Sequence, residues 1–219
     1  GIEVPKTLDE LKAAAQKVKQ AGEMSGFVAR TGKSPAVTQF SSFLFSMGGD
    51  FTDAAGKAAV NSDAAKQAYA LYGELIREYG PANVSTDMSW PEAMAVFTQG
   101  QAAFYTEADS LYKNATDPAK SKVSDTVGFA QFPAGPAGSK PYNIPSWALG
   151  INASSTNVEN AWKFIQWATA KEQVAAQQKS GIPGARTSVW ESADGISSYP
   201  DDLAKAITDS AKVGVDHDR

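Results

Sequence analysis

The sequence predicts an α/β fold, on the basis of three observations. Amphipathic helical patterns recur along the 219 residues, short apolar runs typical of strands lie between them, and these runs are spread along the whole chain. Helical patterns outnumber strand-like runs, and the interspersed strands favour helices layered on a sheet over a helical bundle. The length corresponds to between one and two domains of ordinary size.

The first helix has the clearest signal. Thr7 and Glu10 form a capping box, in which the hydroxyl and the carboxylate satisfy the amides at a helix start. Apolar residues then recur at helical spacing, and Gly22 supplies a stop, so we expect a helix over residues 7–21. By the same criteria, further helices are expected at residues 40–47, 61–79, 89–100, from 157, over 171–180 and from 201.

Short apolar runs predict the strands. They lie at residues 27–29, 102–106, 127–132 and 147–151. The segment 132–139 is rich in proline and glycine, which predicts an irregular loop.

Composition excludes several classes of function. The chain has no cysteine, which removes thiolate nucleophiles, disulfides and cysteine-ligated metals. Its one histidine, His217, lies in a polar terminal run, which argues against a Ser-His-Asp triad or a histidine-rich metal site. With 20 basic and 24 acidic residues the net charge is −4, which argues against nucleic acid as a partner. No apolar run is long enough to span a bilayer. Because the chain begins at Gly1, we read it as a piece or processed product of a longer protein.

A few polar and aromatic side chains are candidates for ligand binding. Glu107 and Asp109 follow a strand-like run, where binding residues often lie, although a helix N-terminus also favours acidic residues. Trp90 and Trp147 lie at element boundaries and could pack on the apolar face of a sugar, or belong to the core. Arg186 follows a glycine–proline turn and could reach a cleft or form a surface ion pair.

Taken in order, several segments resemble one family. These are Pro5-Lys6-Thr7-Leu8-Asp9-Glu10-Leu11, the Gly48-Gly49 … Gly56-Lys57 … Asn61-Ser62 stretch, Phe97-Thr98-Gln99-Gly100-Gln101-Ala102-Ala103-Phe104, Ser146-Trp147-Ala148-Leu149-Gly150-Ile151, and Ala161-Trp162-Lys163-Phe164-Ile165. Each is weak alone, but their order and spacing are specific. The chain resembles the extracellular solute-binding proteins, family 1, of ABC sugar and polyol importers, the maltose-binding-protein-like group.

The resemblance implies a fold and a domain division. It implies a type II periplasmic-binding-protein-like lobe, helix-rich, with a mixed sheet flanked by helices. Residues 1–147 would form the second lobe, and residues 148–219 would cross the hinge and contribute helices to the first lobe. The beginning of the first lobe and the closing helices would lie outside this sequence.

The resemblance also implies a ligand site. A carboxylate of the family stands where Glu107 stands, Trp90 falls where an aromatic residue meets the ligand, and Trp147 matches the aromatic residue of the hinge-proximal strand. Gln39 and Phe40 fall more loosely at the start of a cleft-facing helix. With Asp109 and Arg186, these residues make up the predicted ligand-binding set. No catalytic residue, cofactor or metal is expected.

The function that follows is capture of a sugar or polyol between two lobes and its delivery to the permease of an ABC importer, without chemistry on the ligand. The expected protein is monomeric, lies in the periplasm or outside the cell, and reaches the membrane through the permease or through a lipid anchor outside this sequence. Two alternatives stay open: a glycan-acting enzyme that uses Glu107 and Asp109, and a sensing relative that presents its ligand to a receptor.

Overall fold

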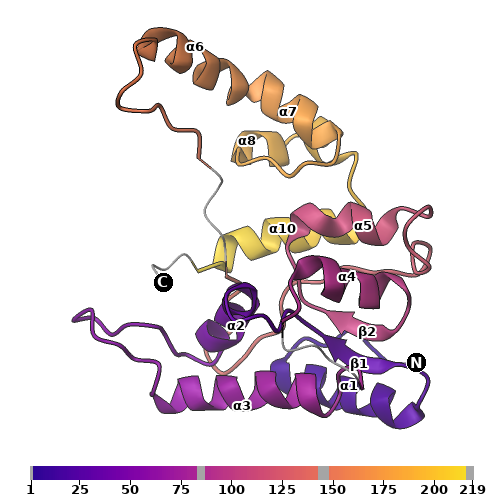
Figure 1. Ribbon diagram of the computed structural model, residues 1–219. Helices are drawn as coiled ribbons and strands as arrows, with labels where there is room; N and C mark the ends of the chain where they lie inside the picture. Colours follow the sequence, from indigo (N-terminus) through magenta and orange to yellow (C-terminus); the bar gives the residue numbers. More distant parts are fainter. Residues whose placement is uncertain (1, 83–86, 143–147, 216–219) are drawn as a thin grey trace.

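A computed structural model describes residues 2–82, 87–142 and 148–215 (Figure 1). Two strands, β1 (Ser25–Val28) and β2 (Ala102–Tyr105), are surrounded by helices. The helices are α1 (Leu8–Ala21), α2 (Pro35–Ser46), α3 (Asp63–Arg77), α4 (Trp90–Thr98), the 3-10 helix η1 (Asp109–Leu111), α5 (Tyr112–Thr116), α6 (Val158–Ala168), α7 (Lys171–Lys179), α8 (Thr187–Trp190), α9 (Ala193–Ile196) and α10 (Asp201–Val213).

Helix α1 forms as its sequence predicts. The Glu10 amide donates to Thr7 Oγ1 at 3.2 Å, and the Thr7 amide donates to Glu10 Oε2 at 3.2 Å, so the capping box is complete. The helix ends at Gly22, whose φ of 81° lies in the left-handed region that glycine adopts without steric cost. Helix α3 likewise begins where Ser62 accepts from the Ala65 amide at 3.3 Å.

The two strands pair in parallel, with Ser25 opposite Ala102 and Val28 opposite Tyr105. Helices α1 and α3 contact β1, α4 contacts β2, and Figure 1 shows α4 on the other side of the strands from α1 and α3. This layering confirms the predicted α/β class. The parallel pair also brings the carboxyl ends of both strands to the same edge of the sheet.

The main core lies between β1 and helices α1, α2 and α3. Phe27 and Phe43 are fully buried and meet edge to face, with ring centroids 6.3 Å apart. Leu8 and Leu11 from α1 and Leu75 from α3 complete the contact between helices and strand. Burial of these apolar side chains stabilises the position of β1, which sets the position of the residues that follow it.

Two of the expected strands do not form in the described residues. Over residues 127–132 the backbone makes other hydrogen bonds: the Val127 amide donates to Val123 O at 2.8 Å, and the Phe129 amide donates to Asp202 Oδ2 at 2.8 Å. No strand forms over residues 148–151 either, and Trp147 lies outside the described residues. The sheet is therefore smaller than the apolar runs predict.

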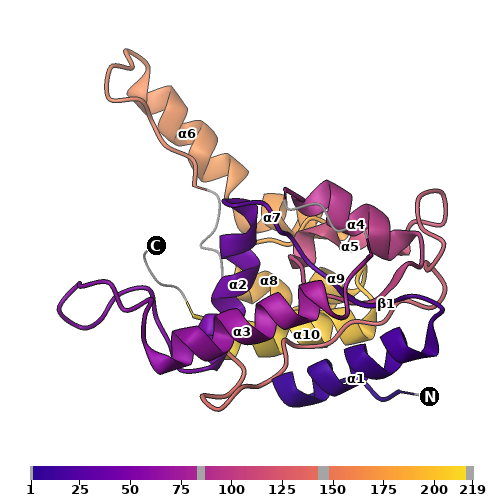
Figure 2. The same cartoon turned by 60° about the horizontal axis from the view of Figure 1, so that its bottom comes forward.

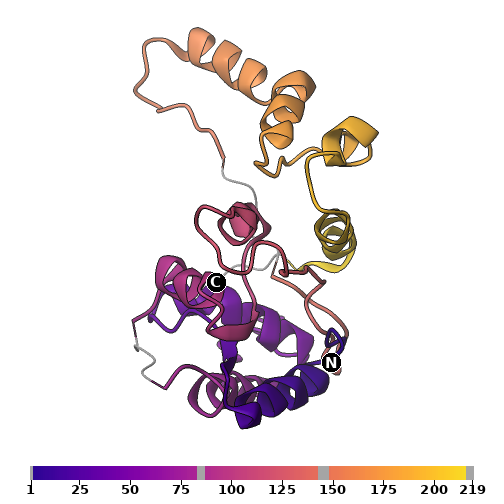
Figure 3. The same cartoon turned by 90° about the vertical axis from the view of Figure 1, so that its right-hand side faces the viewer.

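Helix α6 extends away from the layered part, and all three views show it projecting (Figures 1, 2 and 3). Helix α6 has no buried residue, and Trp162, Phe164 and Trp167 are each more than half exposed. Helix α10 returns to the layered part, where Leu203 packs with Tyr112 of α5 and with Tyr199.

Candidate ligand-binding site

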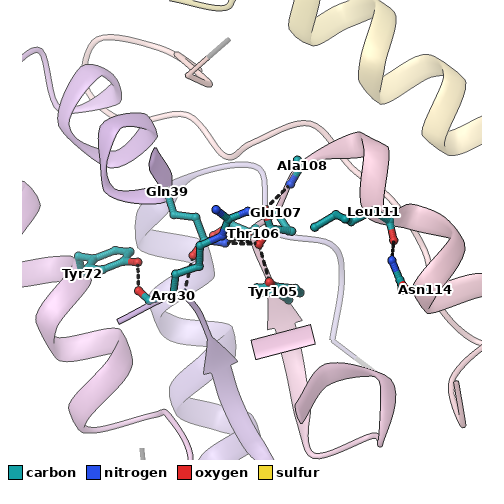
Figure 4. Close-up of polar contacts among 9 residues, drawn as sticks. All are labelled: Arg30, Gln39, Tyr72, Tyr105, Thr106, Glu107, Ala108, Leu111 and Asn114. Carbon is teal, nitrogen blue, oxygen red and sulfur yellow. Dashed lines mark hydrogen bonds and ion pairs between the residues drawn. The ribbon is translucent and has the colours of Figure 1, made fainter. Parts of the chain in front are cut away.

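The carboxyl edge of the parallel strands carries a cluster of polar side chains, which we call the edge cluster: Arg30, Gln39, Tyr72, Tyr105 and Glu107. Arg30 follows the end of β1 by two residues, and Glu107 follows the end of β2 by two residues. Parallel pairing therefore places both at one edge, which in open α/β sheets is where ligands bind. Figure 4 shows the side chains converging.

Arg30 and Glu107 form a two-point ion pair. Arg30 Nε donates to Glu107 Oε2 at 2.8 Å, and Arg30 Nη2 donates to Glu107 Oε1. The Arg30 side chain is 14% exposed and that of Glu107 is 7% exposed. Burial alone would lower the pKa of the Arg30 guanidinium, but the hydrogen bond and negative charge of Glu107 outweigh it and raise that pKa. The guanidinium thus stays charged and fixed in one plane.

Gln39 links the two strand ends from α2. Its Oε1 accepts from the Arg30 amide at 2.7 Å, and its Nε2 donates to Glu107 Oε2 at 3.0 Å and to Thr106 O. The residue is 6% exposed, and these bonds satisfy its amide on both sides. Gln39 therefore holds the loops after β1 and β2 in a fixed relation to each other.

Two tyrosines complete the edge cluster. The Tyr72 hydroxyl donates to Arg30 O at 2.7 Å, and the Tyr105 hydroxyl donates to Glu107 Oε2. Burial raises the pKa of both hydroxyls, and the negative charge of Glu107 raises them further. Both phenols therefore remain donors over the physiological range of pH.

The segment before α4 is tied to the same edge. The Thr31 and Gly32 amides donate to Met88 O at 3.0 and 2.9 Å, and the Met88 amide donates to Thr31 Oγ1 at 3.0 Å. Trp90 follows two residues later as the first residue of α4, and its side chain is 39% exposed. The predicted Trp90 thus lies on a segment fastened to the loop that carries Arg30.

The other predicted residues occupy different environments. Phe40 lies in the core, 6% exposed, and stacks on Tyr69 with ring centroids 4.4 Å apart. Asp109 is exposed at the start of η1. Arg186 is exposed just before α8 and donates from Nε to Thr169 O at 2.6 Å, so it braces the α6–α7 connection. The ligand role of these residues stays a prediction.

Sequence reasoning missed Arg30, Tyr72 and Tyr105. Arg30 had a usable signal, because a charged residue directly after the apolar run 27–29 marks the end of a buried strand. Tyr105 belongs to the run 102–106 that we read as a strand, but nothing in that run shows that its hydroxyl meets Glu107. Tyr72 lies within a helical pattern that gives no sign of a partner 42 positions away.

Two cavities lie elsewhere, along α10. The larger, about 390 Å³, is lined by side chains of α10, of residues 129–134 and of the segment before α1; the smaller is about 280 Å³. Neither includes a residue of the edge cluster. Across residues 2–82, 87–142 and 148–215, no group of three or more His, Cys, Asp or Glu side chains gathers in a way that could hold a metal ion. Within the same ranges, every helix is too short or too polar to cross a membrane.

Comparison with known proteins finds relatives among solute-binding proteins. The family described as bacterial extracellular solute-binding protein matches residues 1–175. An erythritol/L-threitol-binding protein of Mycolicibacterium smegmatis is 33% identical over 125 residues, which cover 57% of this chain and 26% of that protein. A solute-binding protein of Agrobacterium radiobacter K84, solved in complex with ribitol, superposes with a TM-score of 0.82 at 28% identity, over 97% of this chain and 54% of that one.

A third relative is a maltose-bound T. maritima protein, MalE3, with a TM-score of 0.84 at 27% identity over 99% of this chain and 56% of that one. The chain thus spans about half the length of the two solved structures that it resembles. The fold is that of type II periplasmic binding proteins, as the sequence predicts. The match over residues 1–175 identifies the chain as a member of the bacterial extracellular solute-binding protein family.

Proposed function

We propose that the protein captures a sugar or polyol and delivers it to the permease of an ABC importer, without chemistry on the solute. The edge cluster is the observation that carries this proposal. It places an ordered, partly exposed guanidinium where the carboxyl ends of two parallel strands meet, and hydroxyl-rich solutes are recognised by a few precisely placed polar groups of this kind. The names of the erythritol/threitol and ribitol relatives support the same class of solute.

We propose that the solute lies between two lobes. Residues 1–147 would form most of the second lobe, and residues 148–219 would cross the hinge and join the first. The exposed aromatic residues of α6 support this division, because Trp162 is 53% exposed and Trp167 is 56% exposed, and a covering surface would bury them. Solute contacts from both lobes would then favour the closed arrangement.

Within this site, Trp90 is the aromatic surface against which a sugar or polyol would pack. Its ring is partly exposed, and its segment is bonded to the loop of Arg30. Trp147 is proposed for the same role on the hinge side. The full-length protein would act as a monomer in the periplasm or outside the cell, held near the membrane by its permease or by a lipid anchor in another part of the chain.

The position of Glu107 also supports binding without chemistry on the solute. Its two carboxylate oxygens accept from Arg30, Gln39, Tyr105 and the Ala108 amide, which leaves no acceptor for an attacking water. Glycoside hydrolysis needs two carboxyl groups free to act on the glycosidic bond and on water. The edge cluster therefore suits binding better than catalysis.

The test is a thermal-shift screen of the full-length protein against D-mannitol, ribitol, erythritol and maltose, with L-alanine as a solute that has no hydroxyl groups. A solute at about 100 times its Kd stabilises the native state by about 2.7 kcal/mol, so a true ligand raises the melting temperature measurably. Chromatography of the recovered solute should show it unaltered. A shift with L-alanine alone, no shift with any of the four, or a chemically changed solute would refute the proposal.

A further inference from the structure

Hydrogen-bond donors within the protein already occupy the accepting positions of the Glu107 carboxylate. Oε1 accepts from Arg30 Nη2 and, at 2.8 Å, from the Ala108 amide. Oε2 accepts from Arg30 Nε at 2.8 Å, from Gln39 Nε2 at 3.0 Å and from Tyr105. Because a carboxylate has about four lone-pair positions, a solute hydroxyl could reach Glu107 only by displacing one of these partners. Its side chain is also only 7% exposed.

Arg30 has the opposite balance. A guanidinium has five N–H donors, and Glu107 takes one from Nε and one from Nη2. The guanidinium also hydrogen-bonds to the Tyr105 hydroxyl, and this still leaves it with N–H groups beyond those that Glu107 and Tyr105 engage. The side chain is 14% exposed, twice the fraction of Glu107, so solvent reaches a part of it. The spare donors of the pair therefore all belong to Arg30.

We propose that Arg30 donates hydrogen bonds to the hydroxyl oxygens of the solute, and that Glu107 is a positioning residue that acts through Arg30. This inference rests on the proposed function. The two-point ion pair fixes the guanidinium plane, and Gln39 and Tyr72 fix the backbone of Arg30 at its amide and carbonyl. Donors that are already ordered lose little conformational freedom when a solute binds.

The charge balance specifies the class of solute. Glu107 neutralises Arg30 within the pair, so the donors face the solute without a net charge. Such a pair favours a neutral polyhydroxylated molecule over an acidic sugar, because the attraction between the sugar's carboxylate and Arg30 would be offset by its repulsion from Glu107. Arg30 is thus a specificity-determining residue for neutral polyols and sugars.

A double-mutant cycle in the full-length protein separates the two roles. Titration calorimetry with D-mannitol, ribitol, erythritol and maltose would compare Arg30→Gln, Glu107→Gln and the double variant. Loss of charge-assisted hydrogen bonds predicts a roughly 10- to 100-fold weaker Kd for Arg30→Gln. The double variant should equal Arg30→Gln, and Glu107→Gln alone should lose less, because it only loosens Arg30.

The matched control is Glu74→Gln. Glu74 also accepts from a basic side chain, Lys12 at 2.9 Å, and from a tyrosine hydroxyl, Tyr79 at 3.1 Å, but on α3 away from the strand ends. Its Kd should equal that of the wild type. Circular dichroism would check that each variant is folded. Arg30→Gln leaves the buried Glu107 carboxylate without its ion-pair partner, which could prevent folding. In that case the double variant, which has no unpaired charge, is compared with Glu107→Gln.

The outcomes distinguish the inference from the proposed function. When the double variant is compared with Glu107→Gln, an affinity about tenfold weaker in the double variant supports Arg30 as the solute contact, and equal Kd values overturn the inference. In the full cycle, the reverse order, with Glu107→Gln equal to the double variant, or losses that multiply, overturns the inference while the proposed function stands. If the wild type binds none of the four solutes, both are overturned.

Discussion

Replacement of Gly26 by alanine tests how closely the backbone of β1 packs against that of α1. The added Cβ would lie 2.1 Å from Ala15 O, 2.5 Å from Ala15 C and 2.6 Å from Ala15 Cα, whereas real Cβ contacts essentially never fall below 3.0 Å. Because all three atoms are backbone, no side-chain rotation relieves the overlap, and helix and strand must separate by roughly 1 Å. Gly26 has no positive φ, so the cost comes from this contact alone.

We expect Gly26→Ala to lower the free energy of unfolding by about 2 to 4 kcal/mol, at the upper end of the range for overpacking because the backbone must move. Urea denaturation of the full-length protein, followed by circular dichroism, would measure it. Gly150→Ala is the matched control: Gly150 also lacks a positive φ, and its Cβ would meet nothing within 4 Å, so a change within about 0.5 kcal/mol is expected. Equal effects of the two substitutions would refute the packing argument.

Three further predictions concern other parts of the molecule. The raised pKa values of Tyr72 and Tyr105 mean that the native state keeps protons that the unfolded chain loses, so the contribution of these two hydroxyls to stability should be constant below pH about 10 and fall above it; Tyr105→Phe should reduce that fall, and an unchanged slope in alkaline unfolding curves would contradict this. Thr7→Ala should cost about 1 kcal/mol in denaturant unfolding by removing the helix cap, and a Thr7→Ser variant should retain most of that stability. Under the proposed lobe division, a chain limited to residues 1–219 should bind a hydrophobic dye through the exposed aromatic residues of α6, and Trp162→Ser with Trp167→Ser should reduce the dye fluorescence, whereas the same changes in a protein that includes both proposed lobes should not.

The sequence predicts helices better than strands here, for a physical reason. The capping box of Thr7 and Glu10 and the stop at Gly22 are signals within one segment, and they place α1 to within a residue. The apolar run 127–132 carries an equally clear local signal, yet a strand needs a partner, and the Phe129 amide bonds to Asp202, 73 positions along the chain. No local pattern encodes that choice.

The same limit explains why the sequence predicts Glu107 and Gln39 at the site but does not predict their partner Arg30. Glu107 was recognisable as an acidic residue after an apolar run, but its partner Arg30 lies 77 positions earlier, and only the parallel pairing of β1 and β2 brings them together. Gln39 and Phe40 are neighbours in sequence, but successive residues of a helix point about 100° apart. One therefore reaches the strand ends, and the other stacks on Tyr69 in the core.

The separation of Arg30 from Glu107 also determines when the pair can form during synthesis. At roughly 5 to 20 residues per second, about 4 to 15 s pass between the translation of the two residues. During this interval β1 has no β2 to pair with, and its open edge can pair with other chains. Closing so distant a contact also slows folding relative to local helix formation. The nascent chain thus acquires the geometry of the edge cluster only after most of the layered domain has been made.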